Sequence, residues 1–350
     1  MKKKKALVTG STGQDGSYLC NFLLNKNYIV VAADRRSSRD DKSRHKYLSI
    51  EDKLIYEDFD LSDLNSIIRI FQKHKFDEVY NLAAQSFVAA SFNTPLSTAD
   101  VTATGVLRIL ETIRTFSPKT KFYQASSSEM FGKVKSKLLN EDTPFNPRSP
   151  YAVSKLFGHF ITKNYRESYQ MFCCSGILFN HESPLRGEEF VTRKITKQLC
   201  EVKLGKRKFV ELGNIYSKRD WGYAKDYVEA MWKMLQQKKA DDYVISTNSV
   251  FSVKEFIIES FKHLKINAKW KGKGLNEVAV NSETGKIIIK INPKFYRPAE
   301  VDYLRGSYLK AKKTLKWQPK NNFKDLVKLM IDEDYKRVEN ATKTVLRNSQ

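Results

Sequence analysis

The sequence predicts an α/β fold built on a doubly wound parallel sheet, followed by a smaller C-terminal lobe. In the first half of the chain, short apolar segments alternate with longer stretches of helical periodicity, and a glycine-rich turn follows the first of them. Such alternation is typical of parallel strands joined by right-handed helical crossovers. The 350 residues, 41% of them hydrophobic and 29% charged, are enough to bury a core without disulfides.

Six apolar segments are expected to form the strands, because each is short and bounded by polar or turn residues. They cover residues 6–9, 29–33, 54–58, 78–82, 122–126 and 172–178. Helices are expected between them because apolar residues recur with helical spacing. They cover residues 16–25, 62–74, 100–116 and 151–169.

After about residue 180 the alternation becomes irregular, which indicates a second lobe. We assign residues 1–180 to the first domain, with a segment at about 215–245 returning to it, and 181–335 mainly to the second lobe. Residues 271–297 suggest a hairpin or an extended loop. Residues 336–350 are expected to form a polar tail that frays.

The charge balance limits the classes of partner. Lysine and arginine outnumber aspartate and glutamate by 62 to 39, giving +23, which raises nucleic acid, anionic membranes and phosphorylated small molecules as partners. The excess is spread along the chain, and neither an RNA-recognition signature nor a Cys/His finger accompanies it. We therefore expect a lysine-rich surface and a phosphate-binding cleft, with no nucleic acid and no membrane as a partner.

Cysteine spacing predicts no metal site. Cys20, Cys173, Cys174 and Cys200 form no C-x-x-C pair and no metal-ligand spacing with the histidines. The adjacent Cys173 and Cys174 are expected to be reduced thiols in a buried strand, as in a reducing compartment. The N-terminal apolar run is too short for a signal peptide or a membrane span, so we expect a cytoplasmic protein.

A G-x-x-G-x-x-G turn joins the first expected strand to the first expected helix. Its first glycine permits the tight turn, its second lets backbone N–H groups approach a pyrophosphate, and its third packs helix against strand. The helix N-terminus favours the anion. The sequence therefore predicts a dinucleotide site in the first domain, with contacts from Gly10, Thr12, Gly13, Gln14, Asp15 and Gly16.

The end of the second strand bears on which dinucleotide binds. Asp34 stands where an acidic residue binds a free ribose hydroxyl, which favours NAD. Arg35 and Arg36 follow it and can form charge-assisted bonds with a 2′-phosphate. We predict NADP, with NAD as the weaker alternative.

Two short motifs carry the reactive groups. Ser127 and Glu129 supply a hydroxyl and a carboxylate, and Tyr151 and Lys155 supply a phenol and an ammonium at i and i+4, on one helix face. The ammonium, together with a cofactor's positive charge, is expected to lower a phenol pKa that is ordinarily about 10. A phenol tuned in this way can act as a base in sugar redox chemistry.

Taken together, these motifs and several later ones resemble the extended short-chain dehydrogenase/reductase family and, within it, the GDP-mannose 4,6-dehydratase family. The matching motifs are G-S-T-G-Q-D-G-S-Y (10–18), N-L-A-A-Q-S (81–86), P-R-S-P-Y-A-V-S-K (147–155), G-I-L-F-N-H-E-S-P (176–184), K-R-D-W-G (218–222) and R-P-A-E-V-D (297–302). The resemblance runs from about residue 7 to residue 338. It implies a Rossmann domain that binds NADP and a smaller lobe that binds substrate.

The resemblance also implies a reaction. A hydro-lyase of this kind converts GDP-mannose to GDP-4-keto-6-deoxymannose, in deoxysugar nucleotide biosynthesis, by an internal NADP(H) hydride shuttle. Tyr151 would deprotonate the hydroxyl at sugar carbon 4, and Glu129 would take the proton from carbon 5. Lys155 would hold the nicotinamide ribose. Ser127 stands where the family usually has threonine, and either hydroxyl can bond the sugar.

Further site residues follow from the same resemblance. Those implied for the cofactor, besides the glycine turn and the two arginines, are Asp60, Leu61, Leu82, Ala83, Ala84, Gln85, Ser86, Tyr151, Lys155, His181 and Arg186. Those implied for the GDP-sugar are Ser86, Ser127, Glu129, Asn180, Lys194, Arg219, Arg297 and Glu300. A homodimer or homotetramer is expected.

Three alternatives remain open. GDP-D-glycero-D-manno-heptose would use the same chemistry, with its extra carbon near Ser86, Phe87 and Ser127. A 4-keto-sugar-nucleotide reductase or epimerase is less consistent with Glu129, because those reactions need no second base near carbons 5 and 6. A non-enzymatic nucleic-acid binder rests on net charge alone.

Overall fold

The structure is a computed structural model that describes residues 3–38, 42–296, 299 and 301–348, with side chains as far as 341. A seven-stranded parallel sheet has the order β11-β6-β5-β4-β1-β2-β3, so strand order reverses between β1 and β4. Its strands are β1 (Lys5–Thr9), β2 (Ile29–Asp34), β3 (Ile55–Asp58), β4 (Glu78–Asn81), β5 (Lys121–Ser127), β6 (Cys173–Leu178) and β11 (Asp242–Ile245). The predicted doubly wound parallel sheet is confirmed.

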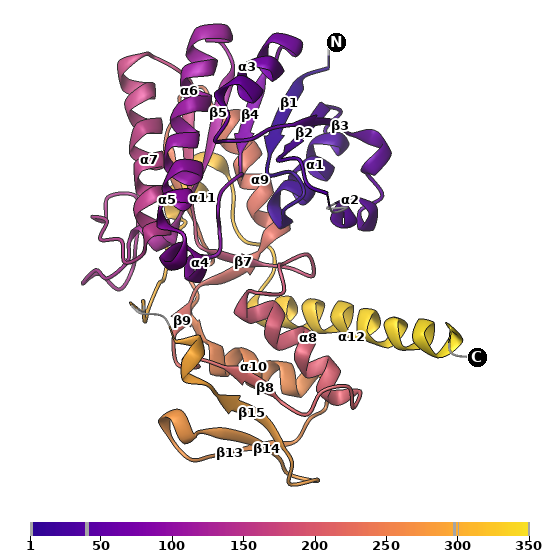
Figure 1. The fold of residues 1–350 in the computed structure, drawn as a ribbon. Coiled ribbons are helices and arrows are strands. Elements are labelled where there is room, and N and C mark those ends of the chain that lie inside the picture. Colours follow the sequence, from indigo (N-terminus) through magenta and orange to yellow (C-terminus); the bar gives the residue numbers. More distant parts are fainter. Residues whose placement is uncertain (1–2, 39–41, 297–298, 300, 349–350) are drawn as a thin grey trace.

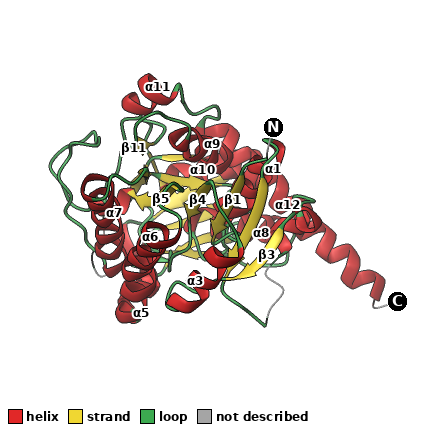
Figure 2. Ribbon diagram, turned by 90° about the horizontal axis from the view of Figure 1, so that it is seen from above, coloured by secondary structure: helices red, strands yellow, loops and turns green. Residues whose placement is uncertain are grey.

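Helices cover both faces of this sheet (Figure 2). One layer holds α1 (Gln14–Asn25), α9 (Ala224–Leu235) and α11 (Leu309–Leu315), and the other holds α3 (Leu64–Lys73), α6 (Gly105–Phe116) and α7 (Pro150–Ser168). Side chains alternate between the two faces along a strand. On β1, Val8 therefore lies in the core shared with α1 and α9, and Leu7 lies in the core shared with α3 and α6.

A second lobe lies below the sheet in Figure 1. Its four-stranded sheet, in the order β13-β14-β15-β8, comprises β8 (Val210–Leu212), β13 (Ala268–Lys271), β14 (Val278–Asn281) and β15 (Ile287–Ile291). It shares a core with α8 (Val191–Lys203), α10 (Val253–His263) and α12 (Phe323–Asn348). The predicted hairpin is present as the antiparallel β14–β15 pair. The division of domains at residue 180 stays a prediction.

The remaining elements are short and connect these layers. They are α2 (Ser43–Tyr47), α4 (Val88–Asn93), α5 (Pro95–Ala99), β7 (Asn180–Glu182), β9 (Lys218–Arg219), β10 (Trp221–Tyr223) and β12 (Phe251–Ser252), with 3₁₀ turns at Glu51–Lys53, Ser128–Met130, Gly274–Asn276 and Pro293–Phe295. The helix expected over 100–116 begins earlier, because α5 runs through a π-helical segment at Asp100–Thr104 into α6. All four cysteines are buried and free.

Helix α12 continues to Asn348, and Val338 is buried in the second core. The helix is anchored because its apolar positions pack on the lobe and because Asp334, 0% exposed, is bonded to Arg193 of α8. The fraying expected for the tail at 336–350 stays a prediction.

Replacing Asp334 with alanine is expected to lower the free energy of unfolding by about 3–5 kcal/mol, because it leaves the buried guanidinium of Arg193 uncompensated. Urea denaturation measures this. Asp332→Ala, which removes an exposed carboxylate paired with Lys328 on the same helix, is the matched control and should cost less than about 1 kcal/mol. Equal losses from the two variants would contradict the assignment of Asp334 as the anchor.

Candidate active site

A cavity of about 610 Å³ lies at the carboxyl edge of the sheet, beside the reversal of strand order between β1 and β4. This edge is where open α/β sheets bind ligands. Residues from β5, α7, β7, α8 and β10 line the cavity. The predicted site residues among them are Gly13, Gln14, Asp15, Leu82, Ala84, Ser86, Ser127, Glu129, Tyr151, Lys155, Asn180, His181, Arg186, Lys194 and Arg219.

Other predicted cofactor residues do not line this cavity. They are Gly10, Thr12, Gly16, Arg35, Arg36, Asp60, Leu61, Ala83 and Gln85, and they follow the carboxyl ends of β1 to β4. Gly10 has a φ of +66°, and a Cβ there would lie 2.9 Å from the Cα of Ala83. A Cβ on Gly16 would lie 2.2 Å from the carbonyl oxygen of Gly10. Arg297 and Glu300 lie outside the described residues.

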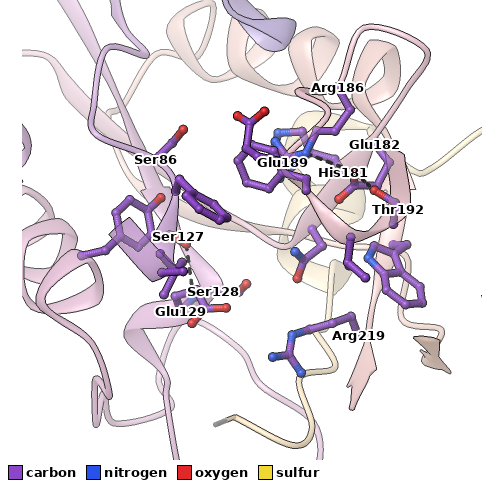
Figure 3. A pocket seen from close by; sticks show the side chains of 18 of the residues that line it. Ser86, Ser127, Ser128, Glu129, His181, Glu182, Arg186, Glu189, Thr192 and Arg219 are labelled. Atoms are coloured by element: carbon purple, nitrogen blue, oxygen red, sulfur yellow. Dashed lines mark hydrogen bonds and ion pairs between the residues drawn. The ribbon is translucent and has the colours of Figure 1, made fainter. Parts of the chain in front are cut away.

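Ser127 and Glu129 are positioned by the end of β5. The Ser127 Oγ accepts a hydrogen bond from the Glu129 backbone N–H at 3.2 Å and so caps the 3₁₀ turn at Ser128–Met130. Glu129 is only 9% exposed. Figure 3 shows this segment on one wall of the cavity, with His181 and Arg186 on the facing wall.

Tyr151 and Lys155 occupy the first turns of α7. Ser149 caps this helix by accepting from the Ala152 backbone N–H at 3.1 Å. The Lys155 Nζ donates to the carbonyl oxygen of Ala125 on β5 at 2.8 Å, which fixes the helix against the sheet. The Tyr151 hydroxyl is hydrogen-bonded to the Ser127 side chain. The structure therefore brings the four predicted catalytic residues together.

The chain by itself does not lower the pKa of the phenol. Burial raises the pKa of Tyr151 to about 12, even though the hydrogen bond from Ser127 and the charge of Arg186 act to lower it. Burial also lowers the pKa of Lys155 to about 8, while the charge of Asp15 opposes that shift. Desolvation outweighs the charges that the chain supplies, and the predicted lowering, which includes the positive charge of a cofactor, stays a prediction.

Asp15 and His181 form a half-buried pair between α1 and β7. The His181 Nε2 lies 2.6 Å from Asp15 Oδ2, and its Nδ1 lies 2.7 Å from the carbonyl oxygen of Phe179. Burial disfavours the charged forms of both groups. Their mutual attraction outweighs this effect, so the pKa of His181 is raised and that of Asp15 is lowered. The imidazole also stacks on Tyr227, with 4.6 Å between ring centroids.

The glycine turn is suited to an anion. Among the residues that the structure describes, no side chain caps the N-terminus of α1, where Gly13, Gln14 and Asp15 face the cavity. The carboxylate of Asp34 is engaged within the turn, because it accepts from the Thr12 backbone N–H at 3.3 Å, from the Thr12 hydroxyl at 3.0 Å and from the Ser11 hydroxyl. Arg35, the next residue, is exposed.

The opposite end of the cavity lies against the second lobe. The Nζ of Lys194 sits 3.4 Å from the ring centroid of Phe295. Within the described part of the chain, Asn180 Oδ1 and Ser217 Oγ are buried without a hydrogen-bond partner, so this end is suited to a polar ligand. Phe190, Asn214, Ser217 and Tyr296 also line the cavity and were not predicted from the sequence. Ser217 directly precedes the K-R-D-W-G motif, and that position was the available signal.

The described residues offer neither a metal-binding cluster nor a membrane-spanning helix. They contain no group of three or more His, Cys, Asp or Glu side chains arranged to hold a metal ion. They also contain no helix with the length and apolar character needed to cross a membrane.

Comparison with known proteins gives consistent matches. A family model for GDP-mannose 4,6 dehydratase matches residues 7–330. The GDP-mannose 4,6 dehydratase of Drosophila melanogaster is 50% identical over 343 residues, covering 95% of this chain and 86% of the relative. That of Yersinia enterocolitica is 46% identical over 353 residues, covering 96% and 95%. Among solved structures, dTDP-glucose 4,6-dehydratase from Bacillus anthracis in complex with NAD has a TM-score of 0.79 at 19% identity, covering 96% and 98%, which shows a shared fold.

The Asp15–His181 pair predicts a pH dependence of stability. Because the pKa of His181 is raised above its unfolded value of about 6.5, its contribution is full below pH 6.5 and is lost as the pH rises through the folded-state pKa. The free energy of unfolding, measured in urea from pH 5.5 upward, should therefore fall across this window. His181→Gln should flatten that slope, and an unchanged slope would refute the pairing.

Proposed function

The chain belongs to the GDP-mannose 4,6-dehydratase family, and we propose that it converts GDP-mannose to GDP-4-keto-6-deoxymannose with loss of water, by an internal hydride shuttle on NADP(H). One observation supports this most directly. A carboxylate, Glu129, shares the wall of one cavity with Ser127, Tyr151 and Lys155. Oxidation and reduction at carbon 4 need no such second base, whereas elimination across carbons 5 and 6 does.

Several features support NADP as the cofactor. NADP(H), when bound, would supply the hydride acceptor for sugar carbon 4 and the hydride donor for carbon 6. The N-terminus of α1 would hold the pyrophosphate. Asp34 has its carboxylate bonded to Ser11 and Thr12, which leaves the exposed Arg35 and Arg36 as the groups suited to a 2′-phosphate.

In the proposed reaction, Tyr151 and Glu129 carry out separate proton transfers. Tyr151 takes the proton of the carbon 4 hydroxyl, and Ser127 orients that hydroxyl. The carbon 4 ketone acidifies the hydrogen on carbon 5, so Glu129 removes it and protonates the hydroxyl that leaves carbon 6 as water. The proton held by Tyr151 returns at carbon 5, and each turnover ends with both residues in their starting protonation states.

Replacing Glu129 with glutamine should reduce net turnover by about 10²–10⁴-fold, because general-base catalysis at carbon 5 is lost. Mass spectrometry of the product measures turnover, and the absorbance of reduced nicotinamide in a single-turnover experiment should still report oxidation at carbon 4. The control is Glu188→Gln, which changes an exposed carboxylate paired with Lys197 and should retain full turnover. Full turnover by Glu129→Gln would favour a reductase or epimerase instead.

Competition between GDP-sugars tests the substrate. With GDP-mannose and GDP-D-glycero-D-manno-heptose present at equal concentration, we expect the mannose product to dominate, because the relatives that match nearly the whole chain are named for GDP-mannose. Mass spectrometry separates the two keto products. Preferential dehydration of the heptose would overturn the substrate assignment while leaving the dehydratase chemistry intact.

A further inference from the structure

A loop at residues 183–187 crosses the interior between β7 and α8. Ser183 is fully buried and Leu185 nearly so. Buried loops are uncommon because their backbone carbonyls need hydrogen-bond donors. Here three successive carbonyls accept from arginines of three helices: Pro184 from Arg193 of α8 at 2.8 Å and from Arg337 of α12, Leu185 from Arg44 of α2 at 2.7 Å, and Arg186 from Arg193 at 2.9 Å.

Arg44 also contacts the glycine turn. Its Nε donates to the carbonyl oxygen of Leu185, and its Nη1 donates to the carbonyl oxygen of Thr12 at 3.0 Å. The neighbouring His45 lies with Nε2 at 2.8 Å from the carbonyl oxygen of Ser11. Arg44 thus joins the turn proposed to hold the cofactor to the loop that carries Arg186.

That loop borders the reacting centre. Its Arg186 faces the cavity (Figure 3), lies 3.5 Å from the ring centroid of Phe190 and pairs with Glu182 at 3.0 Å. A second contact ties the loop to α1, since the Ser183 hydroxyl donates to Gln14 Oε1 at 2.7 Å. A shift of the glycine turn therefore shifts the loop that carries Arg186.

The surroundings of Arg44 disfavour its positive charge. Burial lowers its pKa and Glu189 opposes that shift, while the like charges of Arg193, Arg186 and Arg337 lower it further. A neutral donor would avoid this repulsion but could not make two forked bonds in fixed geometry. The two hydrogen bonds to Thr12 and Leu185 therefore account for an arginine at this position.

We propose that Arg44 is a positioning residue that couples the binding of the dinucleotide to the binding of the sugar nucleotide, through its simultaneous bonds to Thr12 and Leu185. This inference rests on the proposed function. Ordering of the glycine turn by the cofactor fixes the guanidinium, and the guanidinium fixes the loop of Arg186 against the substrate. Because coupling between two ligands is reciprocal, each ligand then strengthens binding of the other by the same factor.

The coupling can be measured without turnover. NADPH cannot accept hydride, so NADPH and GDP-mannose form a dead-end complex, and nicotinamide fluorescence gives the Kd of NADPH with and without saturating GDP-mannose. In the wild-type chain we expect GDP-mannose to tighten NADPH binding by at least about 5-fold. Arg44→Lys keeps the charge but lacks the rigid planar fork whose Nε and Nη1 reach the two carbonyls, and it should reduce this factor to under about 2-fold.

Two further variants complete the experiment. Arg337→Met removes a donor to the same loop without touching the glycine turn, so it should retain the wild-type factor. Ser183→Ala removes the second contact with α1, should also reduce the factor, and serves if Arg44→Lys does not fold. Independent binding of the two ligands to the wild-type chain, or an unchanged factor in Arg44→Lys or Ser183→Ala, would overturn the coupling alone. Failure of GDP-mannose to bind the wild-type chain would overturn the proposed function and the coupling together.

Discussion

A buried chain of hydrogen bonds crosses the three central strands beneath the cavity, and the geometry of the site depends on it. The Thr9 hydroxyl donates to Asn81 Oδ1 at 2.7 Å, and Asn81 Nδ2 donates to Gln124 Oε1 at 2.8 Å. Gln124 Nε2 and Lys155 Nζ both donate to the carbonyl oxygen of Ala125. A slip of one residue in any of these strands would leave buried polar groups unpaired. The network therefore holds the glycine turn, Ser127 and α7 in fixed register at one edge of the sheet.

Burial gives this site its electrostatic character. The pKa of Tyr151 is raised to about 12 and that of Lys155 is lowered to about 8, so desolvation moves both groups toward their neutral forms. A neutral phenol is a poor base, so a positive charge added to the cavity would favour the proposed proton abstraction by Tyr151. Oxidised nicotinamide would supply such a charge only when it is bound. In the proposed reaction, deprotonation of the substrate would thereby be linked to the presence of the hydride acceptor.

Local patterns in the sequence were sufficient for six of the seven strands of the main sheet and for the four reactive groups on the cavity wall. The positions of Gly13, Tyr151 and Lys155 follow from a strand, a turn and a helix that are each recognisable within a few residues. Arg44, Arg193 and Arg337 belong to no such pattern, because their acceptors are backbone carbonyls far along the chain. The burial that raises the pKa of Tyr151 in the chain alone could not be predicted for a related reason: burial depends on the whole packed structure, whereas spacing reports only the neighbouring charge.

The position of Ser127 illustrates what the site requires of a residue. Its hydroxyl accepts from the Glu129 backbone N–H and bonds the Tyr151 side chain, so one oxygen orients both proposed proton-transfer groups. Threonine carries the same oxygen, and its additional methyl takes no part in either bond. Where the family resemblance implies threonine, the serine of this chain therefore keeps the same hydroxyl and lacks only the methyl. The hydroxyl of residue 127, and not the methyl that it lacks, is the part on which the proposed dehydration depends.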